Sequence, residues 1–152
     1  MSTRVITGNT MQNPYAKTAD TYKTQQIQTA SREEILVMLY EGAIRFLNKA
    51  KEGQAEGNIE KSHTNIMKCQ RILTEFMNTL DIEAGGEVAQ NLLSLYEYMH
   101  RRLVQANVKR DPVILEEVLG HLRQLKATWE KAIKIANQEK AGQRGAENVY
   151  SA

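Results

Sequence analysis

Two Glu-x-x-His motifs are the residues of this sequence whose types and spacing could hold a metal. They are Glu60-x-x-His63 and Glu97-x-x-His100. In helical bundles, two such motifs together with glutamates from two further helices build a di-iron carboxylate site, because each motif places both of its ligands on one helix face. A di-iron enzyme is therefore the first hypothesis to test.

The positions of the two motifs along their helices argue against a shared metal. If the two helices form a hairpin that turns between residues 82 and 87, the numbers of facing residues sum to about 169. The motifs then lie about nine residues, or about 14 Å, apart along the axis. Because metal–ligand bonds are only about 2–2.6 Å long, the two motifs are too far apart to share one metal site. Glu97 also lies opposite the apolar stripe of its own helix. We therefore expect no metal and no cofactor.

Other catalytic patterns do not occur in the sequence. There is no glycine-rich phosphate loop, no Gly-x-Ser-x-Gly elbow and no cysteine pair with zinc spacing. The third histidine, His121, has no nucleophile beside it, and a lone histidine on a helix is usually a packing or surface residue. The sequence therefore predicts a binding protein and not an enzyme.

Composition restricts the partners and the compartment. The 152 residues predict a single domain, and 20 basic against 18 acidic residues give a net charge of +2, too balanced for an electrostatic grip on nucleic acid. The single cysteine, Cys69, excludes an internal disulfide and fits a reducing compartment. No apolar run has the length of a signal peptide or a membrane span. We expect a cytoplasmic protein without membrane insertion.

Breakers and apolar periodicity divide the chain into helices and tails. Residues 1–14 and 137–152 are polar and predict flexible tails, so the helical domain is expected to span residues 15–136. A short helical pattern covers about residues 16–28. Four long patterns follow, and they are separated near Gly53, at Gly85-Gly86 and at Asp111-Pro112, with Gly57-Asn58 opening the second.

The lengths of these patterns predict the fold. Each long helix would extend roughly 31–38 Å, and the connections are short. Rods of similar length on short loops stack antiparallel, so we expect an all-α, up-down four-helix bundle. The segment around residues 16–28 would be a short extra N-terminal helix or a capping segment.

The first long helix is too apolar for one buried face. Ser31 and Glu34 fit a capping box at its start. Its core stripe is expected to be Leu36, Leu39, Tyr40, Ala43, Leu47 and Ala50, with Phe46 at the edge. Four further apolar residues lie beside or behind this stripe: Ile35, Val37, Met38 and Ile44. Such breadth indicates either an edge helix that touches two neighbours or a groove for an incoming helix.

Several motifs of the sequence resemble a known family. They are Asn13-Pro14-Tyr15, Tyr22, the run from Thr29 to Leu47, Leu95-Tyr96-x-Tyr98, Leu103-x-x-Ala106-Asn107 and Trp129. In this order they closely resemble the flagellar secretion chaperones of the FliS family, over roughly residues 13–135. Two mild departures are Arg32, where the family often has proline, and Glu41, where it often has aspartate.

The resemblance implies a function in protein export. Members of this family bind the disordered C-terminal segment of flagellin in the cytoplasm, block its premature polymerisation and deliver it to a component of the export gate. The resemblance also implies that the segment before the first long helix, which carries Tyr15 and Tyr22, covers part of the apolar binding surface.

The candidate binding residues combine both arguments. From the helix angles we select Ile35, Val37, Met38 and Ile44, and from the resemblance Tyr15 and Tyr22, whereas Leu39, Tyr40 and Leu47 are expected to hold the bundle together. The alternative is a homodimeric helical adaptor or scaffold without a flagellin client, in which a second copy covers the apolar surface.

Overall fold

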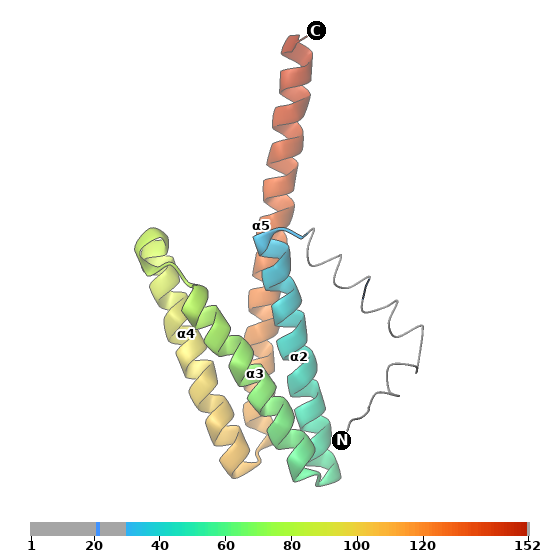
Figure 1. Cartoon of the computed structure of the whole chain (residues 1–152), viewed down its shortest axis with the longest axis vertical. Coiled ribbons are helices and arrows are strands. Elements are labelled where there is room, and N and C mark those ends of the chain that lie inside the picture. The colour runs from blue at the N-terminus through green and yellow to red at the C-terminus, as the bar shows by residue number, and fades with distance from the viewer. Residues whose placement is uncertain (1–20, 22–29, 152) are drawn as a thin grey trace, which may run out of the picture. The chain divides into compact units, whose positions relative to one another are not determined.

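The computed structural model describes Thr21 and residues 30–151. Its four long helices are α2 (Arg32–Glu56), α3 (Ile59–Thr79), α4 (Ile82–Lys109) and α5 (Pro112–Ser151) (Figure 1). The described residues include no strand, which confirms the all-α class. The chain divides into two compact units, Met1–Ile35 and Leu36–Ala152, and the packing described below concerns the second unit. No described helix combines the length and the apolar character needed to cross a membrane.

Side-chain caps start two helices at the predicted residues. The Oδ1 atom of Asn58 accepts a hydrogen bond of 3.0 Å from the amide of Lys61 at the start of α3. The Oδ1 atom of Asp111 accepts one of 2.9 Å from the amide of Val113 at the start of α5. Both caps satisfy amides that have no partner inside the helix, so the predicted starts are confirmed.

The first long helix does not stop at Gly53, as the sequence predicted, but continues to Glu56. Gly57 has the positive φ angle (71°) that favours glycine after a helix end. Gly53 is buried instead, because a Cβ atom there would lie 2.7 Å from the backbone nitrogen of Ser62 in α3. Its hydrogen side chain lets the two helices approach closely.

The break between α3 and α4 also differs from the prediction of Gly85-Gly86. The helix α3 ends at Thr79, Leu80 is extended, and the Oδ1 atom of Asp81 accepts a hydrogen bond of 3.0 Å from the amide of Ala84. Gly86, with φ 55° and ψ −133°, forms a kink inside α4. The prediction was wrong because the Asp81 cap starts a new helix before the glycines are reached.

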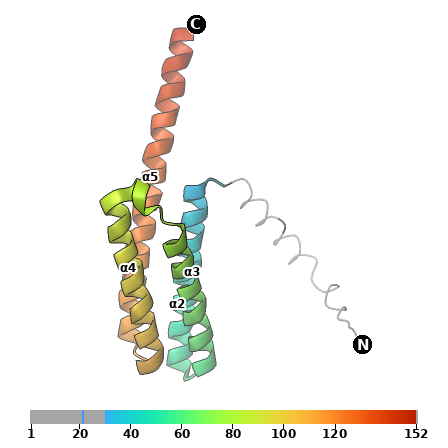
Figure 2. The same ribbon diagram turned by 60° about the vertical axis from the view of Figure 1, so that its left-hand side comes forward.

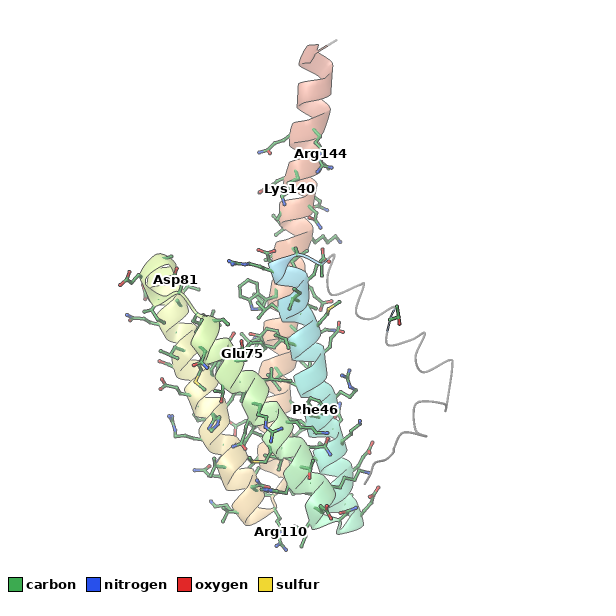
Figure 3. All side chains as sticks on the ribbon, viewed as in Figure 1. Phe46, Glu75, Asp81, Arg110, Lys140 and Arg144 are labelled. Atoms are coloured by element: carbon green, nitrogen blue, oxygen red, sulfur yellow. The ribbon has the colours of Figure 1, made fainter. Side chains whose placement is uncertain are left out.

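The last helix continues beyond its predicted end near residue 136 and reaches Ser151 (Figure 2). Residues 134–145 are exposed, and Lys140 and Arg144 stand clear of α2, α3 and α4 (Figure 3). A helix pairs its own backbone groups, so this segment needs no burial for its hydrogen bonds. The predicted helix end is wrong, whereas flexibility of residues 137–152 stays a prediction. The predicted tail of residues 1–14 lies outside the described residues.

The core follows most of the predicted apolar stripes. The fully buried apolar side chains come from all four helices: Tyr40, Ala43, Leu47, Ala50, Ile66, Cys69, Leu73, Met99, Leu103, Ala106, Leu115, Val118, Leu119 and Leu122. Four apolar residues that continue the apolar periodicity of α3, α4 and α5 are exposed, namely Ile59, Val88, Ala132 and Ala136. Ile59 and Val88 lie near the starts of α3 and α4, whereas Ala132 and Ala136 lie well inside α5. Burial raises the pKa of Cys69 to about 12, which keeps this thiol protonated and unreactive.

Three aromatic rings join α2, α3 and α4 in the core. The ring of Phe76 lies 4.6 Å from that of Tyr40 and 5.3 Å from that of Tyr96, measured between centroids. The hydroxyl groups of Tyr40 and Tyr96 hydrogen-bond to each other. Burial raises the pKa of both tyrosines above their usual range. The pair therefore stays neutral and satisfies two buried hydroxyls at once.

We expect Tyr96→Phe to lower the free energy of unfolding by about 1 kcal/mol, because it removes the hydrogen bond and keeps the ring. Because both pKa values are raised in the folded state, tyrosines of the unfolded chain ionise first as the pH rises, and stability should fall from about pH 10 upward. Urea unfolding at neutral and alkaline pH measures both effects. The double variant Tyr40→Phe/Tyr96→Phe should show a smaller alkaline loss, and an unchanged loss would contradict this assignment.

Candidate protein-binding face

The helix α2 carries the four described residues that were predicted to bind a partner. Ile35, Val37, Met38 and Ile44 are all half-buried. Ile44 packs against the hydrophobic core, whereas Val37 and Met38 lie outside the set of side chains that do so. Half-buried apolar side chains beside a complete core are the ones available for a further partner. Tyr15 and Tyr22, the other two predicted residues, lie outside the described residues.

The same helix supplies the core residues that the sequence separated from this face. Tyr40 and Leu47 are fully buried, and Leu39 is partly buried against the core. The predicted role of these three residues in holding the bundle together is therefore confirmed. The start of the helix is also as predicted, since the hydroxyl of Ser31 accepts a hydrogen bond of 3.2 Å from the amide of Glu34.

Charged side chains mark the side of α2 that faces α5. The Nζ atom of Lys51 lies 2.6 Å from a carboxylate oxygen of Glu116, and Lys126 lies 3.7 Å from Glu41. The hydrogen bond from Lys51 lowers the pKa of Glu116. Exposed pairs of this kind contribute little to stability. They show that α5 lies along this side of α2.

Another side of α2 contacts α3. A Cβ atom added at Gly42 would lie 3.7 Å from the Cδ1 atom of Ile72. The half-buried ring of Phe46 has the Nζ atom of Lys68 at 5.4 Å from its centroid. The guanidinium carbon of Arg45 lies 5.8 Å from the centroid of the same ring. The sequence placed Phe46 at the edge of the core stripe but did not identify the lysine, because the pair joins two helices. A cation near an aromatic face is favourable. The side of α2 that carries Phe46 is therefore covered by α3.

The residues of the two Glu-x-x-His motifs lie at separate levels of the α3–α4 pair. His63 shares a hydrogen bond of 2.9 Å with Asn107 near the end of α4. His100 borders a shallow pocket with Met67 and Gln70 of α3. Both pairings agree with the predicted register. Within residues 30–151, no group of three or more His, Cys, Asp or Glu residues could hold a metal ion.

Comparison with known proteins identifies the family. The model of the family described as "Flagellar protein FliS" matches residues 12–136. The chain is 33% identical to the flagellar secretion chaperone FliS of Bacillus subtilis, over 89% of this chain and 97% of that protein. It is 33% identical to FliS of Campylobacter jejuni, over 88% of this chain and 100% of that protein. Its identity to FliS of Vibrio cholerae is 35%, over 70% of this chain and 78% of that protein.

The described residues define an all-α helical protein. The match over most of the chain then gives the family: the chain belongs to the FliS family, whose matched relatives are flagellar secretion chaperones and not enzymes.

Proposed function

We propose that this flagellar secretion chaperone binds the C-terminal segment of flagellin in the cytoplasm. The segment is disordered in the free subunit and folds as an amphipathic helix only against an apolar neighbour. Bound to the chaperone, it cannot polymerise prematurely, and the complex is delivered to a component of the flagellar export gate. The names of the matched relatives support a function in flagellar secretion.

The observation that carries this proposal is the apolar face of α2. Val37 and Met38 are half-buried but lie outside the core set, and Ile35 and Ile44 extend the same apolar character along the helix. Apolar side chains that are half-buried beside the core are available to a further apolar partner. We assign Ile35, Val37, Met38 and Ile44 to the client site.

The proposed scaffold is an antiparallel up-down bundle. In support of it, Glu41 pairs with Lys126, and Lys51, ten residues further along α2, pairs with Glu116, ten residues earlier in α5. Opposite residue order along the two helices is expected when they run antiparallel. The contacts between α3 and α4 follow the same rule: His63 with Asn107, and Phe76 with Tyr96. We propose that residues 15–136 form this chaperone domain between flexible tails of residues 1–14 and 137–152.

The N-terminal segment has a proposed role as a cover. Tyr15 and Tyr22 would place their rings on the apolar face in the free protein, and a short extra helix or capping segment would carry them. A client then has to displace the segment, so the free energy of its docking subtracts directly from the affinity for the client.

The test is calorimetric titration of the full chain with a peptide covering roughly the last forty residues of a flagellin, followed by circular dichroism of the mixture. We expect saturable binding, a negative heat-capacity change and added helix, because apolar burial and coupled folding occur together. No binding at high micromolar peptide to a folded monomer would remove the flagellin proposal. A tight dimer whose dissociation competes with the peptide would favour the homodimeric adaptor instead.

A further inference from the structure

A small pocket lies where the α2–α3 turn meets the end of α4. Its volume is about 150 Å³. Six of its lining side chains come from α2, α3, α4 and the two connections that follow α2 and α4: Gln54, Asn58, Ile59, Ser62, Asn107 and Arg110. Figure 3 shows Arg110 at this end of the second unit. The pocket is separate from the residues assigned to the client site.

The amide of Gln54 is the unusual feature of this pocket. Its Nε2 and Oε1 atoms are both buried, and neither has a hydrogen-bond partner among the described residues. Buried polar groups are nearly always paired, and an unpaired amide destabilises the folded state. Because Gln54 also lines the pocket, rotation about its terminal torsion can turn the amide towards a ligand that offers an acceptor and a donor.

The charge of the pocket is positive. Arg110 lines it and forms no ion pair with any described residue, and no carboxylate is among the lining residues. The acidic residues beside the lining residues in sequence do not line the pocket. Glu52 and Glu56 pair with Lys61, Asp111 caps α5, and Glu60 is exposed without an ion pair to any described residue. A guanidinium group without a partner favours binding of a carboxylate, because its N–H groups can donate hydrogen bonds to both carboxylate oxygens.

Exposed apolar side chains occur around the same chain segments. Ile59, which lines the pocket, is 54% exposed, and Val108 and Val113, on either side of Arg110 in sequence, are 78% and 71% exposed. Ile59 therefore places exposed apolar surface at the pocket itself, which is typical of a protein-binding surface.

We propose that this pocket binds an aspartate side chain of an acidic peptide segment in a partner protein. The carboxylate would pair with Arg110, the peptide backbone would satisfy the amide of Gln54, and a neighbouring apolar residue would cover Ile59. A volume of about 150 Å³ is smaller than the usual pocket for a cofactor. It suits one side chain. The site does not depend on the proposed client.

The experiment is NMR titration of the full, isotope-labelled chain with the tripeptide acetyl-Leu-Asp-Gly-amide, without flagellin. We expect saturable shifts of the Gln54 side-chain amide and the Arg110 Nε–H signal at millimolar peptide. The matched peptide with asparagine in place of aspartate should bind at least about tenfold more weakly, because it lacks the charge that Arg110 recognises.

Three variants make the test specific. Arg110 has a positive φ angle (54°), which asparagine tolerates, so Arg110→Asn should remove the charge, keep the fold and weaken peptide binding about tenfold. Gln54→Met should raise the melting temperature, because it removes the unpaired amide, and still weaken binding. Arg101→Gln removes a charge from an exposed position of α4 that does not line the pocket and should leave binding unchanged.

The outcomes that would overturn the proposal are equally definite. They are the absence of saturable shifts at millimolar peptide, equal binding of the aspartate and asparagine peptides, or unchanged binding in a folded Arg110→Asn variant. Because flagellin takes no part in this titration, its failure and a failure of flagellin binding are separate results.

Discussion

Replacing Leu47 with aspartate is expected to unfold the protein at room temperature. Leu47 is fully buried among the core residues of the bundle. The substitution leaves a cavity, which costs about 3–5 kcal/mol, and a buried carboxylate without a partner, which costs several kcal/mol more. Together these losses are comparable to the roughly 5–15 kcal/mol that stabilise a typical domain. Circular dichroism and urea unfolding measure the effect. A cooperative transition near that of the parent protein would contradict the placement of Leu47 in the core.

The matched change at Val37 separates folding from binding. Val37 lies on the same helix and is half-buried outside the core set. Val37→Asp should therefore cost only about 1 kcal/mol of stability, while affinity for the flagellin peptide should fall at least about tenfold. Equal losses of stability in Leu47→Asp and Val37→Asp would show that helix angles do not divide α2 into a core face and a client face.

Gly53→Ala is the second change with a large expected effect. A Cβ atom at this position would lie 2.7 Å from the backbone nitrogen and 3.1 Å from the Cα atom of Ser62, and 3.1 Å from the carbonyl oxygen of Asn58. Backbone atoms cannot move aside as a side chain can, so α2 and α3 would have to separate. We expect a net loss of about 2 kcal/mol, even though alanine favours helix more than glycine does.

Gly120→Ala is the matched control for this prediction. Gly120 is exposed within α5, and an added Cβ atom would have no contact within 4 Å. The same substitution should therefore stabilise the protein by about 0.5–1 kcal/mol through helix propensity alone. Opposite signs for the two variants in urea unfolding would confirm that close approach of α2 and α3 depends on Gly53. A stabilising Gly53→Ala would contradict it.

Local chemistry determined much of the fold. Asn58 and Asp111 cap helices as the sequence predicted, because a cap needs only a side-chain oxygen within a few residues of unpaired amides. The central parts of the apolar stripes, such as Tyr40 and Leu47, are buried as predicted. The family resemblance was also readable from the sequence, since it rests on the order and identity of residues, and the match to residues 12–136 confirms it.

Only the tertiary structure decided where neighbouring helices begin and end. Ile59 and Val88 continue apolar stripes but are 54% and 70% exposed, because periodicity does not show how far a neighbour extends. Gly53 was predicted to end the helix, but it lies inside α2, and its lack of a Cβ atom allows the close contact with α3. The pocket of Gln54 and Arg110 likewise joins residues more than fifty positions apart. Such contacts depend on the packing of whole helices, which local sequence patterns do not specify.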